Sequence, residues 1–268
     1  MSQPFCEQLE KAASFALERQ KPDGGFGATP RLPATIEDTY HGLKILHWVG
    51  SYCNNNEIRL FEINKHLEFL RRFTKEPGNL SAKAIFQLVW CFKNCGGAKE
   101  AKNLIRKWSN AVPRCNSREG CYYLFRAYEL IQMDKSGPVC REKFIAFDGI
   151  LFKRWMAIYL DLQCKTGLIN KETASDWIRR CQNYDGGFGF LPGSTSYLEN
   201  SHYALVALSK LGKGLGRKRF EAIEFVLSCQ SEPGGFSRKA DAAPFLDATW
   251  HGTASLILLS KYKKSDSN

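Results

Sequence analysis

Two short segments, one near each end of the chain, combine a carboxylate with an imidazole. The first holds Asp38 and His41, and the second holds Asp247 and His251. A carboxyl group can donate a proton or bind a metal, and an imidazole can do the same. Both segments also open helix-like runs, where aspartate is a common N-cap. The residue types alone therefore fit a reactive site and simple helix capping equally well.

The elements that must position these residues are marked by a repeated turn. The pattern Gln-x-x-(Asp or Pro)-Gly-Gly-Phe occurs at residues 20–26, 182–188 and 230–236. A Gly-Gly pair can reach positive φ and end a helix sharply, and the phenylalanine can anchor the turn in the core. Three copies indicate a structural repeat. We expect the second glycine of each pair to adopt a backbone that a Cβ would strain, and each phenylalanine to be buried.

Between the turns, the sequence predicts helices and no strand. Apolar residues recur at helical spacing, as at Phe5, Leu9, Ala13 and Leu17, and no segment alternates with a period of two. Turn glycines recur about every fifty residues, which is room for two helices and two loops. The chain is therefore predicted to be all-α, with about five to six helical hairpins. Hairpins of this kind must stack to bury both faces, in an open superhelix or a closed ring.

The middle of the chain departs from the repeat, so its elements are predicted from local pattern only. Residues 117–122 resemble a degenerate turn, because they keep one glycine but lack the Gly-Gly-Phe. Helices are predicted at residues 123–133 and 139–153, where apolar residues recur at helical spacing.

Composition limits the possible partners and the environment. The formal net charge is +11, which favours anionic partners, but the basic residues are scattered in pairs and predict a solvated basic surface. Nucleic acid binding is not expected. No apolar run has membrane-spanning length, and no basic-then-apolar signal peptide opens the chain. Many of the ten cysteines lie in apolar runs, which predicts buried reduced thiols in a cytoplasmic protein.

Several details of the repeat resemble one known superfamily. Cys181-Gln182 before a turn, Gly187-Phe188-Gly189 within it, and the run from Tyr203 to Leu208 resemble the repeat of prenyltransferase β-subunits and squalene (terpenoid) cyclases. The resemblance covers essentially the whole chain and implies one α/α toroid domain over residues 1–268. It also implies inner and outer rings of helices around a central apolar funnel suited to an isoprenoid. The aromatic residues expected to line that funnel are Tyr40, Trp48, Trp90, Tyr123, Phe152, Trp155, Tyr203 and Trp250.

The resemblance implies a zinc site that is incomplete in this chain. Protein prenyltransferases of the superfamily hold zinc with Asp-x-Cys in one repeat and a histidine in another. Asp247 matches the metal-binding aspartate, but Thr249 stands where the cysteine belongs, and a neutral threonine is a poor zinc ligand. Zinc would therefore have to bind Asp247, His251 and a histidine from another inner helix, either His41 or His202. Helix-start histidines that are simply hydrogen-bonded remain the alternative.

The same resemblance implies a substrate site. Basic residues after a Gly-Gly-Phe turn hold the diphosphate in the family, and Arg238 and Lys239 occupy that place here. Trp250 and Tyr40 are expected to contact the isoprenoid. If the ring closes, the N-terminal helix and the helix predicted at 249–262 become neighbours. The two carboxylate–histidine segments should then converge at one mouth, where helix N-termini add positive potential for an anion.

The cyclase branch of the superfamily implies different chemistry. Class II cyclases protonate an alkene with the middle aspartate of Asp-x-Asp-Asp-Thr. Residues 35–39 read Thr-Ile-Glu-Asp-Thr and keep only Asp38-Thr39, and Asp247-Ala248-Thr249 resembles a variant of the motif. A carboxylic acid in a water-poor funnel is a stronger acid when hydrogen bonds stabilise its anion. Against this reading, such cyclases usually carry a second α-domain, and this chain has length for one toroid.

Three functions follow as hypotheses. The favoured one is a prenyltransferase β-subunit-like protein that acts on or binds an isoprenoid diphosphate, together with a helical partner subunit. The second is a small class II terpenoid cyclase that uses Asp38 or Asp247 as its catalytic acid. The third is a toroid without catalysis that only binds a lipid or a protein. Whether the chain is an enzyme is left open by the incomplete zinc site.

Overall fold

The computed structural model describes residues 3–60, 62–111, 116–132, 142–215 and 218–262. Within these ranges the chain forms helices and isolated β-bridges, with no strand, as the sequence predicts. None of the described helices is long and apolar enough to cross a membrane.

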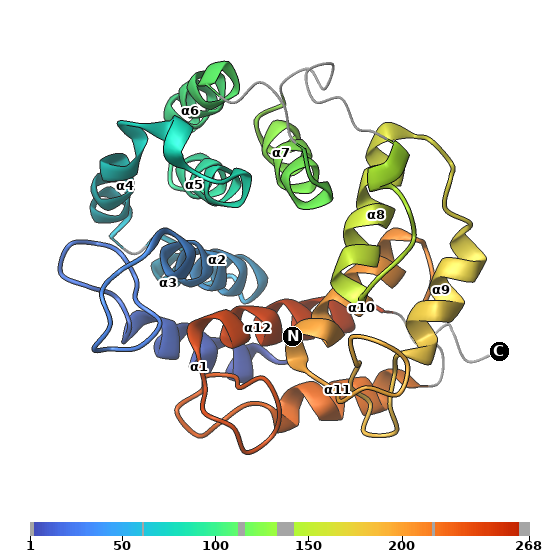
Figure 1. Ribbon diagram of the computed structural model, residues 1–268. Coiled ribbons are helices and arrows are strands. Elements are labelled where there is room, and N and C mark those ends of the chain that lie inside the picture. The colour runs from blue at the N-terminus through green and yellow to red at the C-terminus, as the bar shows by residue number, and fades with distance from the viewer. Residues whose placement is uncertain (1–2, 61, 112–115, 133–141, 216–217, 263–268) are drawn as a thin grey trace.

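The inner helices form a closed ring around the centre of the molecule (Figure 1). Each packs against the next, and α12 returns to pack against α2. Most residues of these helices are buried, because the inner helices pack against their neighbours in the ring and against outer helices. In ring order these helices are α2 (Ile36–Tyr52), α5 (Ala82–Asn94), α7 (Arg118–Ile131), α8 (Leu151–Cys164), α10 (Leu198–Lys210) and α12 (Leu246–Lys261).

The outer helices cover the ring and bury one face each. Helix α9, for example, buries Ala174 and Ile178 and leaves charged residues on its other face. The outer α-helices are α1 (Cys6–Leu17), α3 (Asn56–Leu60), α4 (Ile63–Arg71), α6 (Ala98–Ala111), α9 (Lys171–Arg180) and α11 (Arg219–Ser228). Short 3₁₀ helices at Arg72–Thr74, Pro77–Asn79 and Glu142–Phe144 complete the described elements. The predicted α/α toroid is therefore confirmed.

The Gly-Gly-Phe turns use their two glycines differently from our expectation. Positive φ belongs to the first glycine of each pair, with φ of 89° at Gly24, 85° at Gly186 and 87° at Gly234. The second glycine is needed for space instead. A Cβ on Gly235 would lie 2.3 Å from the ring of Phe15 on the next outer helix. The phenylalanine that follows each pair is fully buried, as predicted.

A hydroxyl group on the following inner helix fastens each turn. The backbone N–H of Phe26 donates to Thr39 Oγ1, that of Phe188 to Ser201 Oγ, and that of Phe236 to Thr249 Oγ1, at 2.9–3.0 Å. These bonds set the register between repeats. In that register Asp247 corresponds to Glu37, the residue before Asp38, and Trp250 corresponds to Tyr40 and His202.

The ring closes between the two ends of the chain, as predicted. Helix α1 packs against both α2 and α12. The side-chain amide of Gln230 donates to the backbone carbonyl of Gln8 at 2.8 Å, which joins residues 222 positions apart. A Cβ on Gly234 would meet the carbonyl oxygen of Lys11 at 2.4 Å, so the last turn presses directly on α1. We call the contact of α1 with α12 and with the turn at residues 230–236 the seam.

Two local predictions in the middle of the chain are wrong. Residues 117–122 are not a degenerate turn, because Ser117 caps α7 by accepting the N–H of Gly120 at 3.0 Å, and Gly120 lies in the first helical turn. A helix at 139–153 is also not formed. Its described part holds the 3₁₀ helix Glu142–Phe144 and an irregular stretch before α8 begins at Leu151, and residues 139–141 lie outside the described residues. The apolar residues at helical spacing are buried without forming a helix, as Phe144 and Ile145 show.

Candidate ligand-binding site

The ring encloses two cavities at opposite ends of the inner helices. The large chamber has a volume of about 560 Å³ and reaches the last turns of α2 and α12 at Tyr52 and Lys261. The small chamber has a volume of about 230 Å³ and lies among the first turns of the inner helices, at Glu37, Glu199 and Asp247. Side chains at mid-height line both chambers, namely Tyr122, Arg126, Tyr203 and Trp250.

Aromatic rings form much of the wall, as the sequence predicts for a funnel. Of the eight expected aromatic residues, all except Trp90 line one chamber or the other. Trp90 instead packs edge-on against Tyr40, with 5.5 Å between ring centroids. Trp250 stacks on His41 at a centroid distance of 4.9 Å and an angle of 11°. The two aromatics proposed to contact an isoprenoid, Tyr40 and Trp250, therefore lie in the centre of the ring.

A buried lysine that the sequence analysis did not single out reaches into the large chamber. Lys44 of α2 is 3% exposed, and its Nζ donates to Tyr40 Oη at 2.6 Å. The ammonium group lies 4.4 Å from the ring centroid of Trp48 and 4.8 Å from that of Trp250, which are cation–π distances. Burial holds the pKa of Lys44 well below its usual value, and the charge of Arg126 lowers it further.

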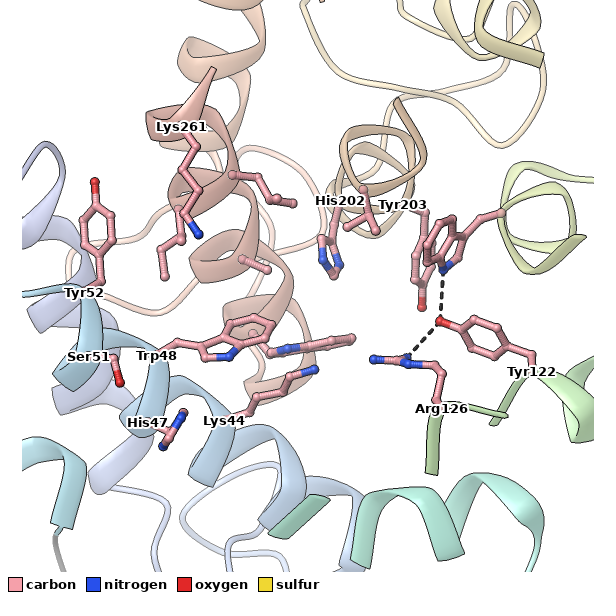
Figure 2. Close-up of a pocket in the computed structure, with 16 residues that line it drawn as sticks. Lys44, His47, Trp48, Ser51, Tyr52, Tyr122, Arg126, His202, Tyr203 and Lys261 are labelled. Carbon is pink, nitrogen blue, oxygen red and sulfur yellow. Dashed lines mark hydrogen bonds between the residues drawn. The ribbon is translucent and has the colours of Figure 1, made fainter. Parts of the chain in front are cut away.

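A second cation faces Lys44 from the other side of the ring. Arg126 of α7 donates to Tyr122 Oη at 2.8 Å, and that oxygen also accepts the indole N–H of Trp155 at 3.0 Å. Figure 2 shows Lys44 and Arg126 pointing toward one another from opposite walls of the chamber. Burial disfavours the charge of Arg126, but Tyr122 and Tyr40 act in the opposite direction and its pKa is raised.

The large chamber is positively charged. Its lining includes Lys44, Arg126 and Lys261, and it includes no aspartate or glutamate among the described residues. Neither Lys44 nor Arg126 forms an ion pair within the described part of the chain. Two cations in an aromatic cavity without a counter-charge are the arrangement expected of a site that binds an amphipathic anion.

One sequence pattern could have revealed these two cations. Lys44 follows Tyr40 by four residues, and Arg126 follows Tyr122 by four residues. In both cases the tyrosine hydroxyl accepts the hydrogen bond of the cation one helical turn later. Each cation also interrupts an apolar run, Leu43-Lys44-Ile45 and Phe125-Arg126-Ala127. A charged residue in the middle of an inner helix is therefore the signal.

At the first turns of the inner helices the small chamber opens in a mouth, which holds several residues that the sequence singled out. Their charges are paired with charges of opposite sign. Asp247 and Arg238 both line the small chamber, and an Arg238 guanidinium nitrogen lies 3.7 Å from Asp247 and 3.9 Å from Glu199. Lys83 pairs with Glu37 at 2.6 Å. Three carboxylates thus share the mouth with two cations. Acidic residues in a first helical turn are also favoured by the helix dipole without any ligand.

Two of the predicted site residues do not line either chamber. Asp38 is bonded to the N-cap residue Thr35, whose hydroxyl accepts the Asp38 N–H at 3.0 Å and donates to the Asp38 carboxylate at 2.7 Å. Partial burial nevertheless raises the pKa of Asp38. Lys239 is exposed beside the mouth, and its side chain reaches no partner among the described residues.

Three buried histidines lie between the two chambers. His251 Nδ1 is 2.8 Å from His202 Nδ1, and His41 is stacked on Trp250. Burial lowers the pKa of all three, to about 3 for His251, so they are neutral at pH 7. Because His202 lines the large chamber and His251 the small one, their contact connects the two.

The residues expected to hold zinc do not fit that role. No group of three His, Cys, Asp or Glu side chains in the described residues is placed to hold a metal ion. Thr249 is fully buried, and its hydroxyl is used twice, accepting from Phe236 N and donating to the Phe245 carbonyl at 2.7 Å. Asp247 faces Arg238, and His251 faces His202. Thr249 therefore stabilises its Gly-Gly-Phe turn by a hydrogen bond, as Thr39 does.

Comparisons with known proteins agree with this architecture. A family model described as a prenyltransferase alpha-alpha toroid domain matches residues 3–131, 152–212 and 195–268. The β-subunit of a type-2 geranylgeranyl transferase from Candida albicans is 32% identical over 95 residues, 34% of this chain and 28% of that protein. A drimenyl diphosphate synthase from Streptantibioticus cattleyicolor is 24% identical over 265 residues, 88% of this chain and 42% of that protein.

The chain spans less than half the length of these curated relatives. Among solved structures, the type II terpene cyclase MstE from Scytonema superposes with a TM-score of 0.63 at 11% identity. That superposition covers 95% of this chain and 96% of the cyclase chain, and it shows a common fold.

Proposed function

Because the chain belongs to the prenyltransferase alpha-alpha toroid family, we propose that it binds an isoprenoid diphosphate in the large chamber. The observation that carries the proposal is the chamber itself, which combines aromatic walls with two cations and no carboxylate among its described lining residues. An isoprenoid diphosphate matches both properties, because its hydrocarbon favours the rings and its head favours the cations. The volume of about 560 Å³ lies in the usual range of ligand sites.

The relatives support this class of ligand. Two are named as β-subunits of geranylgeranyl transferases, namely the one from Candida albicans and a type-1 subunit from Arabidopsis thaliana that is 43% identical over 44 residues, and a third is named as a synthase of a terpenyl diphosphate. For the transfer of a prenyl group, the proposal includes a second subunit, because those relatives are described as subunits. The proposal includes no zinc ion, because Thr249 accepts the Phe236 N–H and Asp247 faces Arg238. We expect purified protein to contain zinc well below one equivalent, and a full equivalent by elemental analysis would contradict this.

A type II terpene cyclase is the second candidate. It is supported by the drimenyl diphosphate synthase, which aligns with 88% of this chain, and by the fold that this chain shares with a type II terpene cyclase. Asp247 and Asp38 would be the acids. The buried cations argue against it, because a carbocation near Lys44 and Arg126 would be destabilised by charge repulsion. A cyclase would have to keep the reacting carbons away from both cations.

Direct binding measurements test the proposal. Isothermal titration and thermal shift with farnesyl diphosphate, geranylgeranyl diphosphate and geranylgeraniol should show binding of the diphosphates at least about tenfold tighter than binding of the alcohol, since charge-assisted contacts are worth about 1.5–3 kcal/mol. Gas chromatography of the same mixtures detects any cyclised product, and such a product would favour the cyclase. Equal affinity for the alcohol and the diphosphate would contradict the proposed diphosphate site and would indicate that the protein binds only the hydrocarbon.

A further inference from the structure

Resting on that proposed function, we infer that the anionic head of the ligand lies deep in the ring, between Lys44 and Arg126. This differs from the sequence-based expectation, which places the diphosphate at the small-chamber mouth beside Arg238 and Lys239. In the inferred orientation the head is at mid-height of the inner helices. The hydrocarbon then extends through the large chamber toward the last turns of α2 and α12.

The first argument is that the polar groups at mid-height lack an anion. Lys44 and Arg126 have only tyrosine hydroxyls as hydrogen-bond acceptors and no counter-charge in the described residues. The indole nitrogen of Trp250 is buried without any acceptor, and the residue lines both chambers. An indole nitrogen can only donate. Buried cations without a counter-charge and a buried donor without an acceptor are costly, and the oxygens of a diphosphate would supply both the charge and the acceptors.

The second argument is that the cations of the mouth are already engaged. Arg238 faces the carboxylates of Asp247 and Glu199, and Lys83 is paired with Glu37. A diphosphate at that mouth would have to displace carboxylates and would be repelled by the three of them. Arg238 is also 57% exposed, so that solvent screens its attraction for an anion. Lys44 and Arg126 carry neither disadvantage.

The third argument is the wall beyond the two cations. From Trp250 toward the end of α12, the chamber is lined by Ala254, Ile257 and Leu258, with Val206 of α10 and Trp48 of α2 opposite. These side chains offer apolar contact to a hydrocarbon and no positive charge to an anionic head. Trp250 and Leu258 are eight residues apart, so the apolar wall extends about 12 Å along the helix. The isoprenoid chain therefore fits on this side of the cations.

Inorganic pyrophosphate and geranylgeranyl diphosphate separate the head from the chain in one experiment. Arg126→Met and Lys44→Met remove one cation each and leave an unbranched apolar side chain in its place. Each should weaken pyrophosphate and geranylgeranyl diphosphate by about 10- to 100-fold in titration calorimetry. Leu258→Asp places a carboxylate at the chain end. It should weaken geranylgeranyl diphosphate by about tenfold or more and leave pyrophosphate within about twofold.

Two further variants keep the inference falsifiable. Arg126→Lys retains the charge and should recover part of the lost affinity, whereas a variant that fails through misfolding would not be rescued. Arg238→Met tests the rival head site at the mouth. Melting curves of all variants show that the ring is intact, and exchange of an unpaired buried cation for methionine should not lower the melting temperature.

The outcomes distinguish this inference from the proposed function. If Arg238→Met abolishes binding of pyrophosphate while Arg126→Met and Lys44→Met bind it normally, the diphosphate site stands but the deep head position is wrong. If the unchanged protein binds neither pyrophosphate nor geranylgeranyl diphosphate, the proposed function itself fails. If only the deep-cation variants lose pyrophosphate, and Leu258→Asp loses only the isoprenoid compound, the inferred orientation is supported.

Discussion

Three histidines are held neutral inside the ring, and this makes the fold sensitive to acid. Burial lowers the pKa of His41, His202 and His251, and the charge of Lys44 acts in the same direction on each. The unfolded chain takes up these protons near pH 6.5, whereas the folded protein resists them until much lower pH. The unfolded state therefore binds more protons as the pH falls, and stability is lost.

We expect the free energy of unfolding to fall as the pH is lowered from about 6.5 toward 4. Because the folded pKa of His251 is about 3, His251 stays neutral in the folded protein, and the stability that it contributes is lost progressively as the pH falls from about 6.5 to 4. Urea unfolding at a series of pH values measures the effect. His251→Asn should flatten the profile relative to the unchanged protein. A stability that is constant between pH 6.5 and 4.5 would show that the histidines are protonated in the folded state.

Thr249 allows a test of its structural role that is independent of ligand. Thr249→Val removes the hydroxyl that accepts from Phe236 N and leaves a buried N–H without a partner. The expected cost is about 1–3 kcal/mol of unfolding free energy. Thr249→Ser keeps the hydroxyl and is the matched control, with a clearly smaller loss. Equal melting of the valine and serine variants would mean that the turn does not depend on this hydrogen bond.

The sequence predicted the residues of the mouth better than those of the chamber. His41, Asp247 and His251 do gather at one mouth, because the repeat fixes where inner helices begin and ring closure makes the end repeats neighbours. Lys44 and Arg126 escaped attention because they lie in the middle of helices, where no turn marks them. Whether such a cation points into the ring depends on helix rotation, which is set by packing.

At the scale of elements, the repeated turns predicted stacked helical hairpins, and their resemblance to the superfamily implied the toroid. The roles of the two glycines emerge only from the structure. The first glycine has a left-handed backbone, and the second needs space beside an aromatic ring of the next outer helix. The middle of the chain lacks the repeated turn, and the predicted helix at 139–153 was therefore drawn from apolar spacing alone, which irregular buried backbone can imitate.

The turn at the seam should respond strongly to a single methyl group. Gly234→Ala combines an unfavourable positive φ with a contact of 2.4 Å to the carbonyl of Lys11. Gly193 has a φ of 78° and open space around it, so Gly193→Ala measures the backbone cost alone, about 1–2 kcal/mol. Gly234→Ala should cost at least about 1 kcal/mol more in chemical denaturation, as overpacking does. Equal losses for the two variants would show that the turn can move away from α1.

For the whole molecule, the central question is whether the closed ring unfolds as one unit. Phe15 of α1 and Phe225 of α11 occupy equivalent places, each against the second glycine of a turn. Phe15 lies at the seam, whereas Phe225 lies within the continuous run of repeats. Each phenylalanine is buried, so truncation to alanine should cost about 3–5 kcal/mol in either place.

Comparison of Phe15→Ala with Phe225→Ala therefore tests closure. In a cooperative ring the two variants lose stability to within about 1 kcal/mol of each other, and both unfold in a single transition. If α1 were only loosely attached, Phe15→Ala would be nearly neutral, or α1 would separate in an earlier transition. Equilibrium unfolding followed by circular dichroism and by tryptophan fluorescence distinguishes these outcomes.

The seam has a consequence for how the protein is made. A ribosome that adds about 5 to 20 residues per second completes Gln230 about 10 to 45 seconds after Gln8, although these residues are hydrogen-bonded in the finished ring. During that interval α1 lacks its partners on the turn at residues 230–236 and on α12, and the buried Phe15 has no turn to cover it. The nascent chain therefore presents an uncovered apolar edge that a chaperone can bind, until the final inner helix emerges and closes the circle.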